Sequence, residues 1–439
     1  MKRLLNFILF FQLLVMTGAC QKPKPILPNQ PKPPVPESKF PTNLEIVWLS
    51  PFCLDSAGGD WIWNFQVANE QYIVVANTRE RDVGERPRGI GIYNMQTGKR
   101  HSAWQNDPSG IFMANEIEDL MDCKTAGKNK EIILIYNQRA LFGYSLHNGQ
   151  RLWTLNIKSP TSMGIPQMSA DENYAYISYN QNGMFSNSWS RLAKVDVYSG
   201  EKTDILTLHS EDNYEFYINP PSSYVTSNGD ILLFFTTDCG NYETHHGRGS
   251  VYCYNLTQKQ MAWEHKQFTL TDMGASSFNP PPFVIENDKL IVTTRKEISC
   301  LDKNTGAIIW QRGDLSFADR PPLYWEGKLY IRSGDPCILI CLDAQTGLQL
   351  WENTVINPIP APNGRMAIYK DNLYFSAWGT NATHHLACVD IHTGQELWRD
   401  RGPWGNIAFD VLIDQKTGYL YCYTGWSTMC VDLNKTPKK

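Results

Sequence analysis

The chain has 439 residues and a formal net charge of -4 at pH 7, with 40 Lys and Arg against 44 Asp and Glu. Nucleic-acid-binding proteins carry an excess of basic residues, so this balance excludes that class and predicts no nucleic-acid partner. Only 19% of the residues are charged, which favours a fold in which β-sheet faces are largely buried.

Residues 1–20 have the layout of an export signal. Lys2 and Arg3 precede an apolar run, and the segment ends in Thr17-Gly18-Ala19-Cys20. This end resembles the lipobox of bacterial lipoproteins, although Thr17 stands where Leu is usual. We expect Cys20 to be lipidated and to anchor the protein in the outer membrane. A plain secretory signal remains the alternative, and the apolar run is short of the roughly 20 residues that a membrane span needs.

Residues 21–41 are dense in proline and predict an extended linker, at about 3.1 Å per residue. The remaining segment, 42–439, is expected to form one domain.

The domain contains a short sequence motif that recurs at intervals of 41 to 59 residues. Its clearest copies are CLDKNTGAIIW (300–310), CLDAQTGLQLW (341–351) and CVDIHTGQELW (388–398). The Asp and Thr side chains can bond to the backbone of a turn, and Gly supplies a positive φ. A strand-turn-strand unit at such a period predicts a β-propeller, in which the Trp packs between neighbouring blades.

Eight copies of the turn align on one anchor position. The anchors are Gly98, Gly149, Gly200, Lys259, Gly306, Gly347, Gly394 and Thr436. The Trp lies four residues after the anchor in five copies and six residues after it at Trp104, and Asp204 stands there in the third copy. We therefore expect the third blade to be the least regular.

Each turn follows a β-rich run, and a further short strand, often after proline, precedes that run. The sequence predicts an all-β fold: an eight-bladed propeller of four-stranded antiparallel blades. The last blade lacks a fourth strand, which Leu44–Ser50 can supply, with Trp48 in the Trp position. The N-terminal strand would then close the ring and remove its exposed edges.

Five cysteines share one position, six residues before the anchor: Cys253, Cys300, Cys341, Cys388 and Cys430. Equivalent sites in different blades are too far apart for disulfides, so we interpret these residues as small buried hydrophobes. A disulfide between Cys422 and Cys430 remains open, with free thiols the favoured state.

The Asp-x-x-Thr-Gly-x-x-x-Trp unit, at Asp302, Asp343 and Asp390, resembles the tryptophan-docking repeat of the pyrroloquinoline-quinone-like (PQQ-like) propeller superfamily. That superfamily includes quinoprotein dehydrogenases and the propeller lipoprotein of the outer-membrane β-barrel assembly machinery, whose layout this chain resembles. The resemblance implies the fold. Quinoprotein enzymes often carry an adjacent Cys-Cys pair, which this chain lacks, and we predict no cofactor.

Two vicinal His pairs, His245-His246 and His384-His385, lie between predicted strands. Adjacent residues on a strand point to opposite faces, so a pair rarely gives two ligands to one ion. We predict no metal site.

Long loops between the second and third strands favour a common rim on one face. These loops are 178–191, 236–250 and 376–385, and they are rich in aromatic and polar side chains, which suit recognition of a protein or a glycan. The candidate binding residues are Trp189, Tyr242, His245, His246, Arg248, Trp378, His384, His385 and Trp426.

The sequence thus predicts a monomeric, membrane-anchored lipoprotein that acts as a non-catalytic binding or scaffold module. The alternative is a periplasmic enzyme, for example a PQQ-dependent oxidoreductase, with its site in the central funnel. The sequence shows no nucleophile-base constellation, so that alternative has no residues to name.

Overall fold

A computed structural model gives the structure of residues 42–51, 61–78, 89–105, 112–113, 122–137, 139–157, 166–181, 189–209, 215–241, 246–272, 281–286, 288–294, 297–313, 315, 322–333, 337–356, 364–378, 384–402, 407–424 and 427–436. All of them belong to the compact unit Glu37–Lys439. The predicted signal, Cys20 and the linker lie outside the described residues. Among the described residues, no helix has the length and apolar character needed to cross a membrane.

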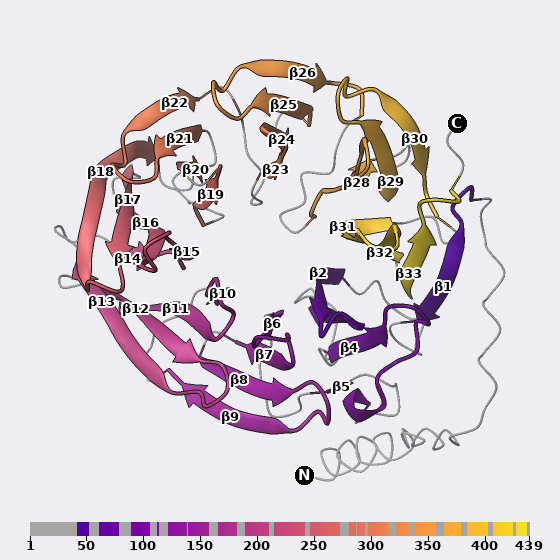
Figure 1. Cartoon of the computed structure of the whole chain (residues 1–439), viewed down its shortest axis with the longest axis horizontal. Helices are drawn as coiled ribbons and strands as arrows, with labels where there is room; N and C mark the ends of the chain where they lie inside the picture. Colours follow the sequence, from indigo (N-terminus) through magenta and orange to yellow (C-terminus); the bar gives the residue numbers. More distant parts are fainter. Residues whose placement is uncertain are drawn as a thin grey trace, which may run out of the picture. The chain divides into compact units, whose positions relative to one another are not determined.

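The unit is all-β and consists of eight antiparallel sheets arranged in a ring (Figure 1). This arrangement confirms the eight-bladed propeller predicted from the repeat. In each of blades 1 to 7 the strands follow one another in sequence order from the centre outwards, as Figure 1 shows. The single helical element among the described residues is the 3-10 turn η1 (Ser102–Trp104).

The strands of the first four blades are as follows. Blade 1 has β2 (Trp61–Ala68), β3 (Tyr72–Thr78), β4 (Gly89–Asn94) and β5 (Phe112–Met113); blade 2 has β6 (Asp122–Ala126), β7 (Ile132–Tyr136), β8 (Ala140–Ser145) and β9 (Arg151–Asn156). Blade 3 has β10 (Gln167–Met168), β11 (Tyr174–Gln181), β12 (Trp189–Asp196) and β13 (Lys202–His209); blade 4 has β14 (Glu215–Ile218), β15 (Ser222–Val225), β16 (Ile231–Asn241), β17 (His246–Asn255) and β18 (Gln260–Asp272).

The other four blades complete the ring. Blade 5 has β19 (Phe283–Ile285), β20 (Lys289–Thr293), β21 (Ile298–Asp302) and β22 (Ile308–Arg312); blade 6 has β23 (Leu323–Trp325), β24 (Lys328–Arg332), β25 (Leu339–Asp343) and β26 (Gln349–Asn353). Blade 7 has β27 (Ala367–Tyr369), β28 (Asn372–Trp378), β29 (His384–Asp390) and β30 (Glu396–Asp400); blade 8 has β31 (Ile407–Asp414), β32 (Tyr419–Thr424), β33 (Ser427–Asp432) and β1 (Ile46–Pro51).

The second and third strands of each blade form the core because both of their faces pack against neighbouring blades. In β7 every residue of the run IILIY is buried, and strands buried on both faces favour such continuous β-branched and aliphatic runs. Outer strands differ: in β9 no residue is fully buried, and from Leu152 onwards exposed and half-buried positions alternate.

The N-terminal strand closes the ring, as the sequence predicted. β1 pairs antiparallel with β33, so the last sheet has the order β1-β33-β32-β31. The residues just before β1 hold the strand in place: Thr42 Oγ1 and the Asn43 backbone N–H both donate to the Asp400 carboxylate, at 2.9 Å each. In Figure 1 the indigo β1 lies beside the yellow β33.

The repeated turn works as the sequence predicted. Asp302 Oδ1 accepts hydrogen bonds from the backbone N–H groups of Asn304 and Thr305, at 2.9 and 2.8 Å, and from the Thr305 hydroxyl. The same bonds recur at Asn94, Asp343 and Asp390. Lys259, which replaces Gly at one anchor, adopts the same positive φ, 54°.

Six docking Trp residues connect their blade to the next one by a hydrogen bond. In each of them the indole N–H donates to a backbone carbonyl three residues before the next anchor. The bonds are Trp48 to Met95, Trp104 to Leu146, Trp153 to Val197, Trp263 to Lys303, Trp310 to Ala344 and Trp351 to Ile391, at 2.7 to 3.0 Å. The ring lies on the anchor itself: a Cβ added to Gly98 would meet the Trp48 ring at 2.5 Å.

The same docking explains the repeated cysteine. A bulge precedes the Trp in six blades and sets it directly opposite one residue of the neighbouring strand, as in the pairs Cys300–Trp310 and Cys341–Trp351. That residue must be small because the indole lies over it: in blade 2 it is Gly143, whose added Cβ would lie 2.3 Å from the Trp153 ring. The five repeat cysteines are buried and unbridged.

The number of strands does not mark blade 3 as the least regular blade, and blades 4 and 1 differ from the expected pattern. Blade 3 keeps four well-paired strands, whereas blade 4 has five, because its inner strand is divided at Pro220-Pro221 into β14 and β15, which both pair with β16. In blade 1 the outer strand, β5, has only two residues. The docking Trp of this blade, Trp104, lies in η1 and not on an outer strand.

Candidate binding face

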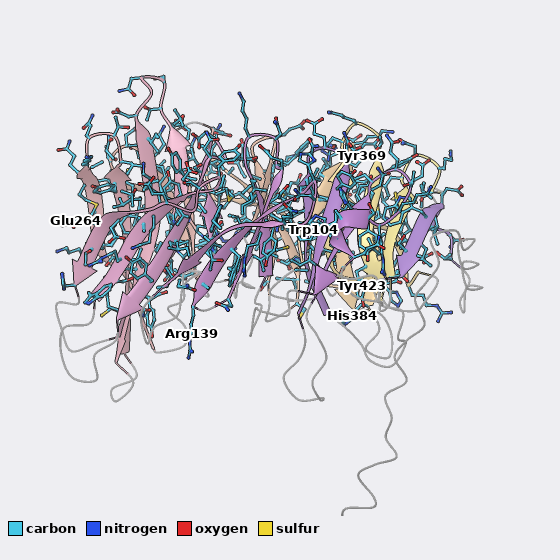
Figure 2. All side chains as sticks on the ribbon, turned by 90° about the horizontal axis from the view of Figure 1, so that it is seen from below. Trp104, Arg139, Glu264, Tyr369, His384 and Tyr423 are labelled. Atoms are coloured by element: carbon cyan, nitrogen blue, oxygen red, sulfur yellow. The ribbon has the colours of Figure 1, made fainter. Side chains whose placement is uncertain are left out.

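The blades present two distinct faces. The repeated turns lie on one, which we call the turn face. The second strand meets the third on the other, which we call the rim face, and each connection to the next blade begins there. In Figure 2, Arg139 and His384 lie on the rim side, and Tyr369, beside a first-to-second strand turn, lies on the opposite side.

Hairpin lengths show how far each blade reaches towards the rim face. Counted from the repeated turn, the second and third strands form five residue pairs in blades 5 and 6, seven in blade 7, eight in blade 3 and ten in blade 4. At about 3.4 Å per residue, the five extra pairs of blade 4 extend about 17 Å beyond blade 5. The three longest hairpins are those whose connections the sequence singled out.

Much of what the sequence predicted as loop is therefore strand. In blade 4, β16 continues to Asn241 and β17 starts at His246. β14 pairs with residues 237–240 of the extension, and β18 follows it to Asp272. Asn219, at the break in the inner strand, donates from its side chain to Thr236 and Asp238, both at 3.0 Å. The part of blade 4 that extends beyond the neighbouring blades, which we call the blade 4 projection, is thus a four-stranded sheet and not a loop.

The predicted binding residues are distributed over three blades. Trp189 begins β12, His246 and Arg248 belong to β17, Trp378 ends β28, and His384 and His385 begin β29. Tyr242, His245 and Trp426 lie outside the described residues.

The His384-His385 pair is part of a strand, not of a loop. His384 is only 8% exposed, and its neighbour points to the opposite face because side chains alternate along a strand. Burial lowers the pKa of both imidazoles; for His384 the neighbouring His385 adds to the effect, and for His385 the neighbouring Arg399 does. Across the described residues, no group of three or more His, Cys, Asp or Glu side chains is placed to hold a metal ion.

Trp189 belongs to an aromatic and charged cluster on blade 3. The Arg191 guanidinium lies 4.7 Å from the centre of the Trp189 ring and donates to Thr207 Oγ1 at 2.9 Å and to Asp204 Oδ2 at 3.1 Å. Lys202 Nζ donates to Asp204 and to the Tyr179 hydroxyl, at 2.6 and 2.7 Å. Burial opposes ionisation of Asp204, but the bonds from Lys202 and Tyr179 outweigh it and lower the pKa of this carboxyl.

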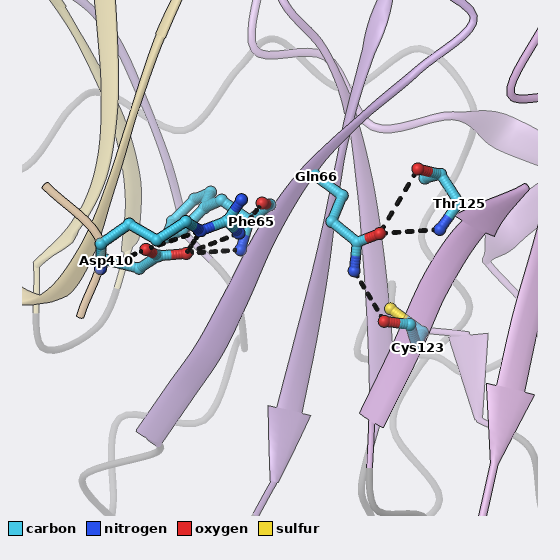
Figure 3. Close-up of polar contacts among 6 residues, drawn as sticks. Phe65, Gln66, Cys123, Thr125 and Asp410 are labelled. Atoms are coloured by element: carbon cyan, nitrogen blue, oxygen red, sulfur yellow. Dashed lines mark hydrogen bonds and ion pairs between the residues drawn. The ribbon is translucent and has the colours of Figure 1, made fainter. Parts of the chain in front are cut away.

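A second polar site, which the sequence did not reveal, joins blades 7, 8 and 1 near the centre of the ring (Figure 3). The Asp410 carboxylate is fully buried, and it accepts from the Phe65 backbone N–H at 3.0 Å and from Arg365 through Nε, Nη2 and its backbone N–H. Arg365 Nη2 also donates to the Phe65 carbonyl. The ring is thus closed at its inner strands as well as by β1.

Gln66 makes the corresponding connection from blade 1 to blade 2. Its side-chain amide donates to the Cys123 carbonyl at 2.6 Å, and its carbonyl accepts from the Thr125 backbone N–H at 2.7 Å (Figure 3). No sequence signal marks these contacts, because the partners are separated by 45 to 345 residues.

A quinone-Ca²⁺ centre would need carboxylate oxygens that are available to the metal. Both oxygens of Asp410 are used by Arg365 and Phe65, so this carboxylate fits a structural role and not a metal ligand.

The comparisons with known proteins agree with this architecture. A PQQ-repeat family model, described as outer membrane protein assembly factor BamB, matches residues 247–418, which is less than half of the chain. No curated protein sequence matches the chain.

Three solved structures share the fold at low identity. The computationally designed Ika8 protein is 11% identical, with a TM-score of 0.55 over 89% of this chain and 100% of its own. The Dos1 propeller is 10% identical, with a TM-score of 0.56 over 88% and 96%. A europium-containing methanol dehydrogenase is 13% identical, with a TM-score of 0.50 over 88% and 85%. At such identities the likeness concerns the fold alone.

Proposed function

Because the chain is a PQQ-like β-propeller, a fold that serves scaffolds as well as enzymes, we propose that it is a non-catalytic binding module that recognises its partner through the rim face. The observation that carries this proposal is the blade 4 projection. Its ten-pair hairpin continues beyond the length that blade packing uses in blades 5 and 6. An ordered sheet beyond the core adds contact surface without adding to the core.

We also propose that the module is a lipoprotein anchored at Cys20. The signal-like segment 1–20 supports this proposal, and the match to outer membrane protein assembly factor BamB supports a place in the bacterial cell envelope. Replacing Cys20 with Ala should abolish incorporation of labelled fatty acid and release the protein from the membrane fraction. Continued labelling of the variant would contradict the assignment.

The binding proposal is tested by cross-linking capture from native membranes. Trp189→Ala, Tyr242→Ala and Trp378→Ala, alone and combined, should reduce recovery of the captured partner while the protein stays folded. Leu348→Ala is the matched control: Leu348 follows a repeated turn on the turn face and is 67% exposed. Equal recovery from all variants would remove the rim face from the binding role.

A quinone-binding and turnover assay tests the enzymatic alternative, and we expect a negative result. The purified protein, supplied with quinone and Ca²⁺, should neither bind quinone saturably nor reduce an artificial electron acceptor with an alcohol or a sugar. Saturable binding with turnover would refute the non-catalytic role.

A further inference from the structure

Blade 3 has Asp204 in place of the docking Trp, and its structure shows what replaces the dock. In blade 5 a bulge sets Trp310 opposite Cys300. In blade 3 the bulge lies two residues later, between the pairs Ala193–Asp204 and Leu192–Leu206, so Thr203 pairs with Lys194. The next residue, Asp204, then points to the other face. This places its carboxylate with Arg191, Lys202 and Tyr179 instead of in the contact with blade 4.

The resulting cluster holds Arg191 in one geometry. Asp204 and Thr207 accept from two of its nitrogens, its central carbon lies over the Trp189 ring, and Tyr179 packs edge-on against Trp189, with ring centres 6.1 Å apart. All five residues are on paired strands. A guanidinium fixed in this way loses little conformational entropy when it binds a ligand.

The cluster has a surplus of positive charge and remains open to solvent. Arg191 and Lys202 carry two positive charges against one on Asp204, and their side chains are 33% and 26% exposed. Because Arg191 covers one face of the Trp189 ring and Trp189 packs against the core between blades 2 and 3, the indole offers little surface on which a sugar ring can stack. A planar anion that pairs with a guanidinium is the better match.

We propose that the Trp189–Arg191 cluster is a carboxylate-binding subsite along β12 and β13 of blade 3, beginning at the rim face with Trp189, and that it receives an acidic side chain from an extended peptide segment of the partner. This inference rests on the proposed binding function and names the chemistry of its partner. Lys202 contributes long-range attraction, whereas the stacked Arg191 makes the direct ion pair.

The test uses fluorescein-labelled octaglutamate as the probe and anisotropy as the readout, at about 50 mM salt because exposed ion pairs are screened by salt. The wild type should bind octaglutamate and neither octaglutamine nor octalysine. Arg191→Gln should weaken binding at least fivefold, and Arg191→Lys should weaken it by less. Trp189→Leu should also weaken binding because the stacking surface is lost.

Arg399→Gln is the matched control and should leave binding unchanged. Arg399, like Arg191, is a strand arginine in an ion pair, with Glu396 at 2.8 Å, but it lies on the outer strand of blade 7. Wild-type near-ultraviolet circular dichroism of each variant would show that the fold is intact.

Absence of octaglutamate binding, or equal weakening by Arg191→Gln and Arg399→Gln, would overturn the inference. Tighter binding of an acidic oligosaccharide such as octagalacturonate would overturn it too and assign the subsite to a glycan. The capture experiment on the rim face remains independent: loss of capture in the Tyr242 and Trp378 variants would uphold the binding function even if the peptide result were negative.

Discussion

Ring closure by the N-terminal strand can be tested at a single side chain, Trp48. This residue is 7% exposed, its ring covers the Gly98 turn of blade 1, and its indole donates to the Met95 carbonyl at 2.9 Å. Trp48→Ala removes all these contacts between the last blade and the first.

The expected loss follows from these contacts. Truncating a buried Trp to Ala costs about 3 to 5 kcal/mol, and the lost indole hydrogen bond adds about 1 kcal/mol. We therefore expect the free energy of unfolding to fall by about 4 to 6 kcal/mol. Trp48→Phe keeps a ring and loses the donor, so its loss should be smaller, about 1 to 3 kcal/mol.

Urea unfolding followed by tryptophan fluorescence and by far-ultraviolet circular dichroism measures these losses. Trp351→Ala is the comparison, because Trp351 makes the same dock inside the ring, to Ile391 at 3.0 Å. Removing residues 1–51 should be more damaging than either substitution, since it exposes the edge of β33, whereas removing residues 21–40 should leave the unfolding midpoint unchanged.

Two results would refute this reasoning. One is a loss below about 1 kcal/mol for Trp48→Ala, since a buried Trp cannot be removed from a tight dock at so small a cost. The other is an equal midpoint for the two truncated proteins, which would show that β1 does not close the ring.

Three further predictions concern buried polar groups. Asp410→Ala should lower stability by about 3 to 5 kcal/mol, because Arg365 would lose its buried partner, whereas Glu70→Ala, in an exposed pair with Lys416, should leave the urea midpoint unchanged; equal effects would contradict the inner closure. Burial raises the pKa of Cys253, Cys300 and Cys341 to about 12. Between about pH 9 and pH 12 only the unfolded chain therefore releases these protons, and the free energy of unfolding should fall as the pH rises. Native thiols that react readily with a thiol reagent at pH 8 would argue against burial. The pKa of His384 is lowered by burial, so the unfolded chain binds the proton first, and the free energy of unfolding should fall as the pH drops below about 6.5. His384→Gln should make stability less dependent on pH in this range, and an unchanged dependence would assign the effect to other groups.

The fold could be predicted from the sequence alone, because each repeated turn is formed by residues that are neighbours in the chain. Asp302, Thr305 and Gly306 form their turn from neighbouring residues, and alternating strand runs require the same local geometry in every blade. The closing strand was predictable too, since Trp48 fits the Trp position that the eighth copy of the repeat lacks. The cysteine position was predicted as buried, but its cause, the Trp directly opposite, appears only in the register of paired strands.

The candidate site depended on tertiary structure. Trp189 and Arg191 are two residues apart, yet the partner Asp204 reaches them only because the bulge of blade 3 lies after Asp204, between the pairs Ala193–Asp204 and Leu192–Leu206, and not before it. A shift of one residue in register moves a side chain to the other face of the sheet. Likewise Arg365, Asp410 and Phe65 meet only when the ring closes, across 45 and 345 residues. Local turn and strand preferences are encoded residue by residue, whereas register and ring closure depend on contacts between distant strands.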